Sequence, residues 1–161
     1  MNEQEIIDRA RTVVFDSMGS GGLGLLSTAD DSGFPHATWM ATMAPAEERQ
    51  LVTLTSPDSR KVANIRSNPR VEWLFTGPEK ADLVYLSGSA EIVSEMEEVK
   101  SYWNLMKEKD LAFFLDHFNT GMGFAIIRTQ VESATLVQPQ EHQSHELDPS
   151  ELWKSIPADR T

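Results

Sequence analysis

Six short segments with the composition of β-strands follow one another in this chain, and turn residues separate several of them at hairpin distance. The clearest turn is 30–33, because Gly33 can adopt the positive φ that a tight hairpin requires. The expected strands are 23–28, 35–43, 51–55, 71–75, 83–93 and 124–137. Helical segments are grouped and do not alternate strictly with the strands. This order predicts a mainly β protein, an antiparallel barrel with added helices, and argues against a doubly wound sheet.

Helices are expected before the first strand, between the fifth and sixth strands and at the end of the chain. Asn2 and Glu5 form a capping box ahead of an apolar face with helical period, and Ser94 and Glu97 form a second one. A further helical piece is expected at 110–118 and a terminal helical turn begins near residue 148. Because 138–145 is polar, that segment is expected to be loose. We therefore predict one domain over residues 1–137 and a polar tail with a short terminal helix over 138–161.

Composition argues against several classes of function. The 161 residues suffice for one domain with a full core, and the absence of cysteine excludes disulfides, thiolate metal sites and thiol nucleophiles. A net charge of −11 argues against nucleic acid and against an anionic membrane surface as partners. No apolar run approaches the ~20 residues of a membrane span, and the acidic start lacks the order of a signal peptide. We therefore expect a cytoplasmic protein.

A basic pair stands out in this acidic chain at a predicted strand-to-helix turn. Ser59, Arg60 and Lys61 fall in the first turn of a short predicted helix. The start of a helix offers unpaired N–H groups and the positive end of the helix dipole. An Arg fork, a Lys charge and hydroxyl donors at that place predict a site for a phosphate monoester. The alternative is a solvated helix start at which Asp58 is only a cap.

Taken in order, these segments resemble the FMN-binding split-barrel superfamily, which includes pyridoxamine 5'-phosphate oxidase, and within it the smaller general-stress-protein branch. The stretches that carry the resemblance are PHATWMAT, LVTLTSPDSRK, VANIRSNPRV and LVYLSGSAEIV. The resemblance implies a six-stranded antiparallel split barrel with FMN as cofactor. It also implies a homodimer with flavin sites at the subunit interface, which would account for Trp73 and Trp153 as interface residues.

The resemblance further implies two groups of cofactor-binding residues. In that family the third-strand hydroxyl and the S-R-K turn hold the FMN phosphate, which implies contacts from Thr55, Ser59, Arg60 and Lys61. The second strand lines the flavin ring and ribityl chain, which implies contacts from Thr38, Trp39, Met40 and Ala41. Trp39 is left open between stacking on the ring and packing, whereas Trp103 is expected to pack on its helix stripe.

The chain departs from the oxidases of that superfamily at three places. Thr38 stands where they carry an Arg that also grips the phosphate, and apolar Leu83 stands where they carry a Gln near the flavin. The chain ends SIPADRT, whereas they end in a basic R-L-x-P tail that helps to bind pyridoxamine phosphate. These departures argue against a genuine pyridoxamine 5'-phosphate oxidase.

No convincing nucleophile, acid–base pair or metal cluster emerges from the sequence. His142 and His145 lie in a polar segment without a carboxylate scaffold, His36 is interpreted as a surface residue and His117 as structural. Flavin chemistry needs no such group, because the cofactor carries the redox step. The sequence therefore predicts a flavin-dependent oxidoreductase with a small-molecule redox partner. Two alternatives stay open: a non-catalytic flavin-binding stress protein that acts as carrier, buffer or sensor, and a relative that uses haem, FAD or a deazaflavin.

Overall fold

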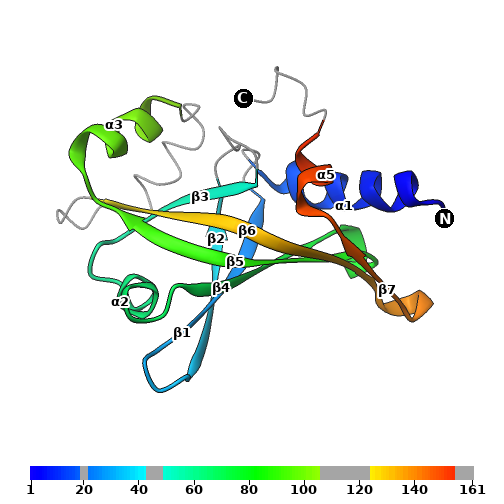
Figure 1. The fold of residues 1–161 in the computed structure, drawn as a ribbon, viewed down its shortest axis with the longest axis horizontal. Coiled ribbons are helices and arrows are strands. Elements are labelled where there is room, and N and C mark those ends of the chain that lie inside the picture. Colours follow the sequence, from blue (N-terminus) through cyan, green and yellow to red (C-terminus); the bar gives the residue numbers. More distant parts are fainter. Residues whose placement is uncertain (19–21, 43–48, 106–123, 155–161) are drawn as a thin grey trace.

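The computed structural model describes residues 1–18, 22–42, 49–105 and 124–154. One antiparallel sheet of seven strands organises them (Figure 1). The strands are β1 (Leu23–Ala29), β2 (Pro35–Ala41), β3 (Gln50–Thr55), β4 (Arg70–Thr76), β5 (Leu83–Val93), β6 (Ala125–Gln138) and β7 (Gln143–Leu147). The helices are α1 (Glu3–Ser17), α2 (Arg60–Ser67), α3 (Met96–Leu105) and α5 (Pro149–Trp153), with two 3₁₀ turns at Pro78–Lys80 and Pro139–Glu141. The predicted fold class, mainly β with added helices, is confirmed.

The sheet curves without closing. Its strands run in the order β2-β1-β4-β5-β6-β3, and β7 also pairs with β6. The two ends of this path, β2 and β3, share no strand pairing in the described residues, but the Thr53 hydroxyl of β3 donates to the Ala41 carbonyl of β2 at 2.5 Å. The long β5–β6 pair shifts register between Ser87 and Gly88, and a glycine is typical of such a bend in a strand. The result is a split barrel with one more strand than the six expected.

The seventh strand begins within the segment expected to be loose. Residues Gln143–Leu147 pair antiparallel with the end of β6, from Ala134 to Gln138. This strand is held by backbone pairing at the edge of the sheet, and none of its side chains is fully buried. Its sequence therefore lacks the apolar alternation by which a strand is usually predicted. Helix α5 follows and lies beside α1 (Figure 1), where the Arg11 guanidinium of α1 donates to carbonyls at the end of α5. Residues 143–154 are thus tied to the barrel by backbone and side-chain contacts.

The main core lies between the sheet and the α1–α5 pair, and it contains two tryptophans predicted at an interface. Trp73 is fully buried, and its Nε1 donates to the Thr129 hydroxyl at 3.1 Å. Trp153 packs edge-on against Phe15, with ring centroids 5.4 Å apart. Both residues therefore stabilise the subunit itself, and their assignment to a dimer interface is wrong.

Several local predictions can be checked directly. The capping box of α1 is present, because the Asn2 side chain accepts from the Glu5 amide and the Glu5 side chain accepts from the Asn2 amide. Gly33 adopts a φ of 83° in the β1–β2 turn. In the described part of the chain, no helix is both long and apolar enough to cross a bilayer. The helical piece expected at 110–118, with His117, lies outside the described residues, as does the side chain of Trp103.

Candidate functional site

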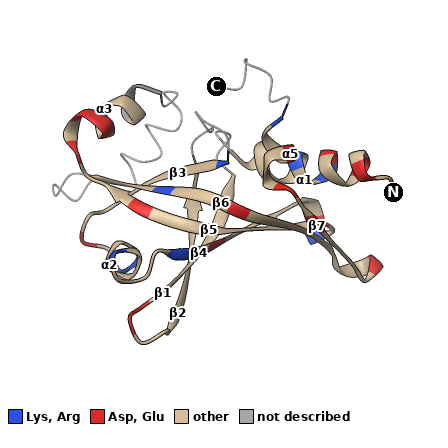
Figure 2. Cartoon of the chain, in the orientation of Figure 1, with Lys and Arg blue, Asp and Glu red and all other residues tan. Residues whose placement is uncertain are grey.

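A cavity of about 380 Å³ lies between the start of α2 and the β1–β2 hairpin. Its lining residues come from three elements and are Thr28, His36, Ala37, Thr38, Arg60 and Lys61. Figure 2 shows basic residues on α2, which carries three cations and no acid. A buried hydrogen bond of 3.0 Å from the Asn64 amide to the Thr28 hydroxyl ties α2 to β1 and fixes the helix against the hairpin. The cavity is thus walled by a sheet on one side and by a cationic helix start on the other.

The first turn of α2 keeps its backbone donors available. Ser59 occupies the cap position, but its side chain makes no capping hydrogen bond. Its hydroxyl lies 3.5 Å from the hydroxyl of Thr55 at the end of β3. Because the first N–H groups of a helix lack intrahelical acceptors, an uncapped start favours an anion.

Lys61 brings a partly desolvated charge to this place. Its Nζ donates to the Thr55 hydroxyl at 3.2 Å, and burial lowers the pKa of its ammonium group. Within the described ranges, no carboxylate forms an ion pair with Lys61 or with Arg60. A bound anion would offset the cost of burying this charge, because an opposite charge nearby favours the ionised form.

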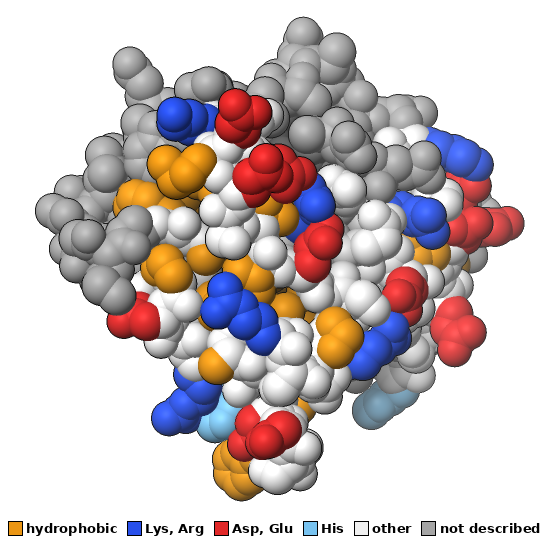
Figure 3. Space-filling view, turned by 60° about the vertical axis from the view of Figure 1, so that its left-hand side comes forward, with side chains coloured by type: hydrophobic (Ala, Val, Ile, Leu, Met, Phe, Trp, Pro, Cys, Tyr) orange, Lys and Arg blue, Asp and Glu red, His pale blue; other side chains and the backbone are white. Residues whose placement is uncertain are grey.

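Arg60 contacts His36, which the sequence analysis interprets as a surface residue. One guanidinium nitrogen of Arg60 lies 3.2 Å from Nδ1 of His36 on β2. The His36 ring also packs against the Phe34 ring, with centroids 5.5 Å apart. Low on the left, Figure 3 shows a basic side chain next to a histidine. Strand alternation could have found this residue, because His36 and Thr38 share one face of β2.

The eight predicted cofactor-binding residues divide into two groups. Thr38, Arg60 and Lys61 line the cavity. The Thr55 hydroxyl accepts from Lys61 and lies 3.5 Å from the Ser59 hydroxyl. Met40, in contrast, is 3% exposed and belongs to the main core, and Trp39 is 53% exposed. The Ala41 side chain is half-buried, and its carbonyl accepts the Thr53 hydroxyl. The structure therefore gathers the predicted phosphate residues, whereas the side chains of Trp39 and Met40 lie outside this cavity.

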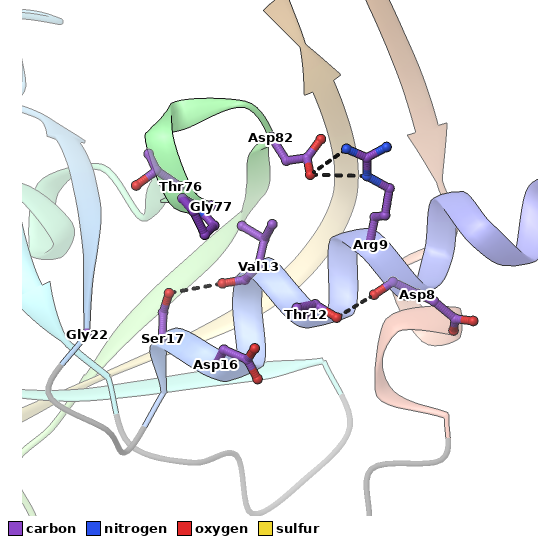
Figure 4. A pocket seen from close by; sticks show the side chains of 11 residues that line it. Asp8, Arg9, Thr12, Val13, Asp16, Ser17, Gly22, Thr76, Gly77 and Asp82 are labelled. Carbon is purple, nitrogen blue, oxygen red and sulfur yellow. Dashed lines mark hydrogen bonds and ion pairs between the residues drawn. The ribbon is translucent and has the colours of Figure 1, made fainter. Parts of the chain in front are cut away.

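A larger cavity, of about 600 Å³, lies between α1 and the β4–β5 connection (Figure 4). Three aspartates line it, Asp8, Asp16 and Asp82, together with one cation, Arg9. Figure 4 shows Arg9 directed at Asp82, and the two form an ion pair at 3.1 Å. The lining is therefore acidic overall, which is the wrong sign for a phosphate group.

Comparison with known proteins decides the family. The model of the pyridoxamine 5'-phosphate oxidase family matches residues 19–138. The chain belongs to this family. Among curated relatives, it is similar to the pyridoxine/pyridoxamine 5'-phosphate oxidase of Escherichia fergusonii, with 26% identity over 129 residues. The match covers 80% of this chain and 57% of that protein, so the chain spans just over half the length of the curated relatives it matches.

Solved structures confirm the split-barrel fold. The Clostridium acetobutylicum protein related to general stress protein 26 superposes with a TM-score of 0.73 at 12% identity, covering 94% of this chain and all of that one. A haem-binding protein from Mycobacterium smegmatis gives a TM-score of 0.69 at 18% identity, covering 91% of this chain and 59% of that one. At these identities the likeness shows the fold alone. Together with the family match, it supports a split-barrel protein of the pyridoxamine 5'-phosphate oxidase family.

Proposed function

We propose that this protein binds FMN by its phosphate group at the start of α2 and serves a flavin-dependent oxidoreduction of a small molecule. The observation that carries the proposal is the pair Arg60 and Lys61, which has no described carboxylate partner and stands at an uncapped helix start. A Lys that is partly buried without a counter-charge is costly in the free protein, so an anion is the expected complement.

The residues fit a phosphate monoester in number and kind. Arg60 can donate from its planar fork, Lys61 supplies a compact charge, and Thr55 and Ser59 supply hydroxyl groups. The uncapped amides at the start of α2 add backbone donors. When bound, FMN supplies two-electron redox chemistry through its ring system. The role of this chain is to hold the phosphate and to orient the remainder of the molecule along β2.

We also propose that the protein is a homodimer that uses the outer face of the sheet. Strand pairing aligns four residues across β2, β1, β4 and β5 into an apolar row, namely Trp39, Leu25, Leu74 and Tyr85. Their chain neighbours Met40, Leu26, Trp73 and Leu86 are buried, so by strand alternation the apolar row faces outward. Strand β2 lines the cavity with residues 36–38, and the next residue, Trp39, belongs to the apolar row. A second copy on this row would therefore adjoin the phosphate site.

The dimer is tested by placing a charge in the apolar row. We expect the wild-type protein to have about twice the 18.0 kDa mass of the chain in light scattering after size exclusion. Leu74→Glu should shift it to the monomer mass, because an interface that buries an unpaired carboxylate loses several kcal/mol. Gln4→Glu, which adds the same charge on exposed α1, should leave the mass unchanged. A wild-type protein that is monomeric at micromolar concentration would contradict this part of the proposal.

FMN binding is tested against riboflavin, which lacks the phosphate. We expect FMN to bind at least about 100-fold more tightly, because two charge-assisted contacts contribute roughly 1.5–3 kcal/mol each. Quenching of flavin fluorescence during titration measures both affinities. Equal affinities would reject the phosphate site, and no binding of either compound would direct the search to haem, which can be titrated in the same way.

Turnover separates the proposed enzyme from a non-catalytic flavin carrier. The FMN-loaded protein is mixed with NADH or NADPH, with and without oxygen. Bleaching of the absorbance of oxidised flavin at about 450 nm is then followed. Bleaching that reverses with oxygen supports the oxidoreductase. Tight FMN binding with no bleaching favours the carrier, and the cytoplasmic location predicted from the sequence suits either role.

A further inference from the structure

His36 lies in the wall of the cavity that β2 forms opposite the start of α2. Thr38 lines the same wall but carries no ionisable group. His36 lies two residues earlier on the same face of β2, about 7 Å away along the strand. Both side chains line the cavity that also contains Arg60 and Lys61. The imidazole is thus the one ionisable side chain that β2 (Pro35–Ala41) brings to this cavity.

We propose that His36 is a third, proton-linked cation of the phosphate site, neutral and bonded to Arg60 in the free protein and protonated when a phosphate monoester binds. This inference rests on the phosphate site of the proposed function. It adds to that site a residue and a dependence of ligand affinity on pH.

The free state follows from hydrogen-bond chemistry. A guanidinium group has five N–H donors and no acceptor. The contact of 3.2 Å between Arg60 and His36 Nδ1 is therefore a hydrogen bond only if Nδ1 accepts. In that state the ring proton sits on Nε2 and the imidazole is neutral. A protonated His36 would instead direct an N–H donor at the Arg60 cation.

The charged groups around His36 explain why the ligand would change its protonation. Arg60 contacts it from α2 and Lys61 lines the same cavity, so both oppose a positive charge on the ring. Asp30, in the β1–β2 turn, favours that charge: hydrogen bonds from the Phe34 amide and the Ser32 hydroxyl lower the pKa of Asp30, and nearby His36 lowers it further. A phosphate dianion that pairs with Arg60 and Lys61 would remove their repulsion and release Nδ1 from Arg60. The imidazole then becomes a donor to the anion.

The direction of the pH dependence follows from the proton count. The complex holds one more proton on His36 than the free protein, so affinity rises as the pH falls from about 8 to about 6, the range in which an imidazole titrates. The phosphate itself gains a proton near pH 6 and loses charge, which weakens binding over the same range. A variant without the imidazole shares the second effect and lacks the first, so the comparison isolates His36.

The experiment measures FMN affinity across this pH range for the wild type, for His36→Gln and for the control His145→Gln. His145 lies on β7, away from α2 in Figure 1. At about pH 6, His36→Gln should bind FMN about 10-fold more weakly than the wild type, which corresponds to one charge-assisted contact, and at about pH 8 the two should agree within about 2-fold. His145→Gln should follow the wild type throughout. Riboflavin should show no difference between the three proteins.

The outcomes separate this inference from the function on which it rests. Parallel FMN curves for the wild type and His36→Gln overturn the role of His36 and leave FMN binding intact. Equal affinities of the wild type for FMN and riboflavin overturn the phosphate site itself. A second measurement uses inorganic phosphate and the NMR signal of the His36 ring: saturating phosphate should raise the midpoint of its titration by about one pH unit. A midpoint that phosphate does not move overturns the inference even if the variant folds poorly.

Discussion

The double variant Arg60→Ala/Lys61→Ala should lose FMN affinity by about 10²–10⁴-fold, because two charge-assisted contacts of roughly 1.5–3 kcal/mol each disappear. Riboflavin affinity should change by no more than about 3-fold, since riboflavin has no phosphate for these side chains to bind. Titration of both compounds by fluorescence quenching gives the two ratios. The variant Arg66→Ala/Lys100→Ala removes the same net charge from the exposed side of α2 and from α3, and it should bind FMN as the wild type does.

The double variant Arg60→Ala/Lys61→Ala should keep the stability of the wild type. This result distinguishes a lost ligand contact from a damaged fold. Burial lowers the pKa of Lys61, so folding disfavours its charged form at every pH below that lowered pKa. Removing the ammonium therefore relieves a cost in the free protein. We expect the melting temperature of the ligand-free variant to lie no more than about 2 °C below that of the wild type. An affinity loss accompanied by a large drop in melting temperature would contradict our assignment of these residues to the ligand.

Gly88→Ala should destabilise the protein by about 3 kcal/mol or more. Gly88 sits at the register shift between β5 and β6, and a Cβ built there lies 2.0 Å from the Gln130 carbonyl oxygen. Because this neighbour is backbone in the longest strand pair of the sheet, it cannot turn aside as a side chain would. Overpacking of this kind typically costs 1–3 kcal/mol, and a forced backbone shift lies at or above the upper end of that range. Urea unfolding measures the change.

Ser87→Ala is the matched control for the glycine. Ser87 directly precedes Gly88 on β5, and its hydroxyl donates to the Glu72 carboxylate at 2.8 Å at an exposed position. Losing this bond should change the free energy of unfolding by no more than about 0.5 kcal/mol. If Gly88→Ala unfolds at the same urea concentration as Ser87→Ala, the close approach of the two strands at this bend does not restrict the size of the side chain.

The grouping of the proposed phosphate ligands could be predicted from the sequence, whereas the orientation of the side chains on the second strand could not. Ser59, Arg60 and Lys61 are contiguous, so any helix start at that turn places them together. The neighbours on β2 depend on which face of the strand turns inward. The structure turns Thr38 and His36 toward α2 and Met40 into the core, while Trp39 stays on the other face. Since a strand alternates faces at every residue, the side chains of four consecutive residues cannot all face one cavity, and flavin contacts from Trp39, Met40 and Ala41 stay predictions.

The sequence by itself determined the strands, their hairpin order, the capped first helix, the cationic turn and the family, because each depends on residues close together in the chain. The tertiary structure alone decided the seventh strand, the burial of Trp73 and Trp153, and the contact between His36 and Arg60. These features depend on contacts between residues far apart in the chain, such as His36 and Arg60, which are separated by 24 positions in the sequence. Local propensity carries no information about such pairings, which the packing of the whole barrel selects.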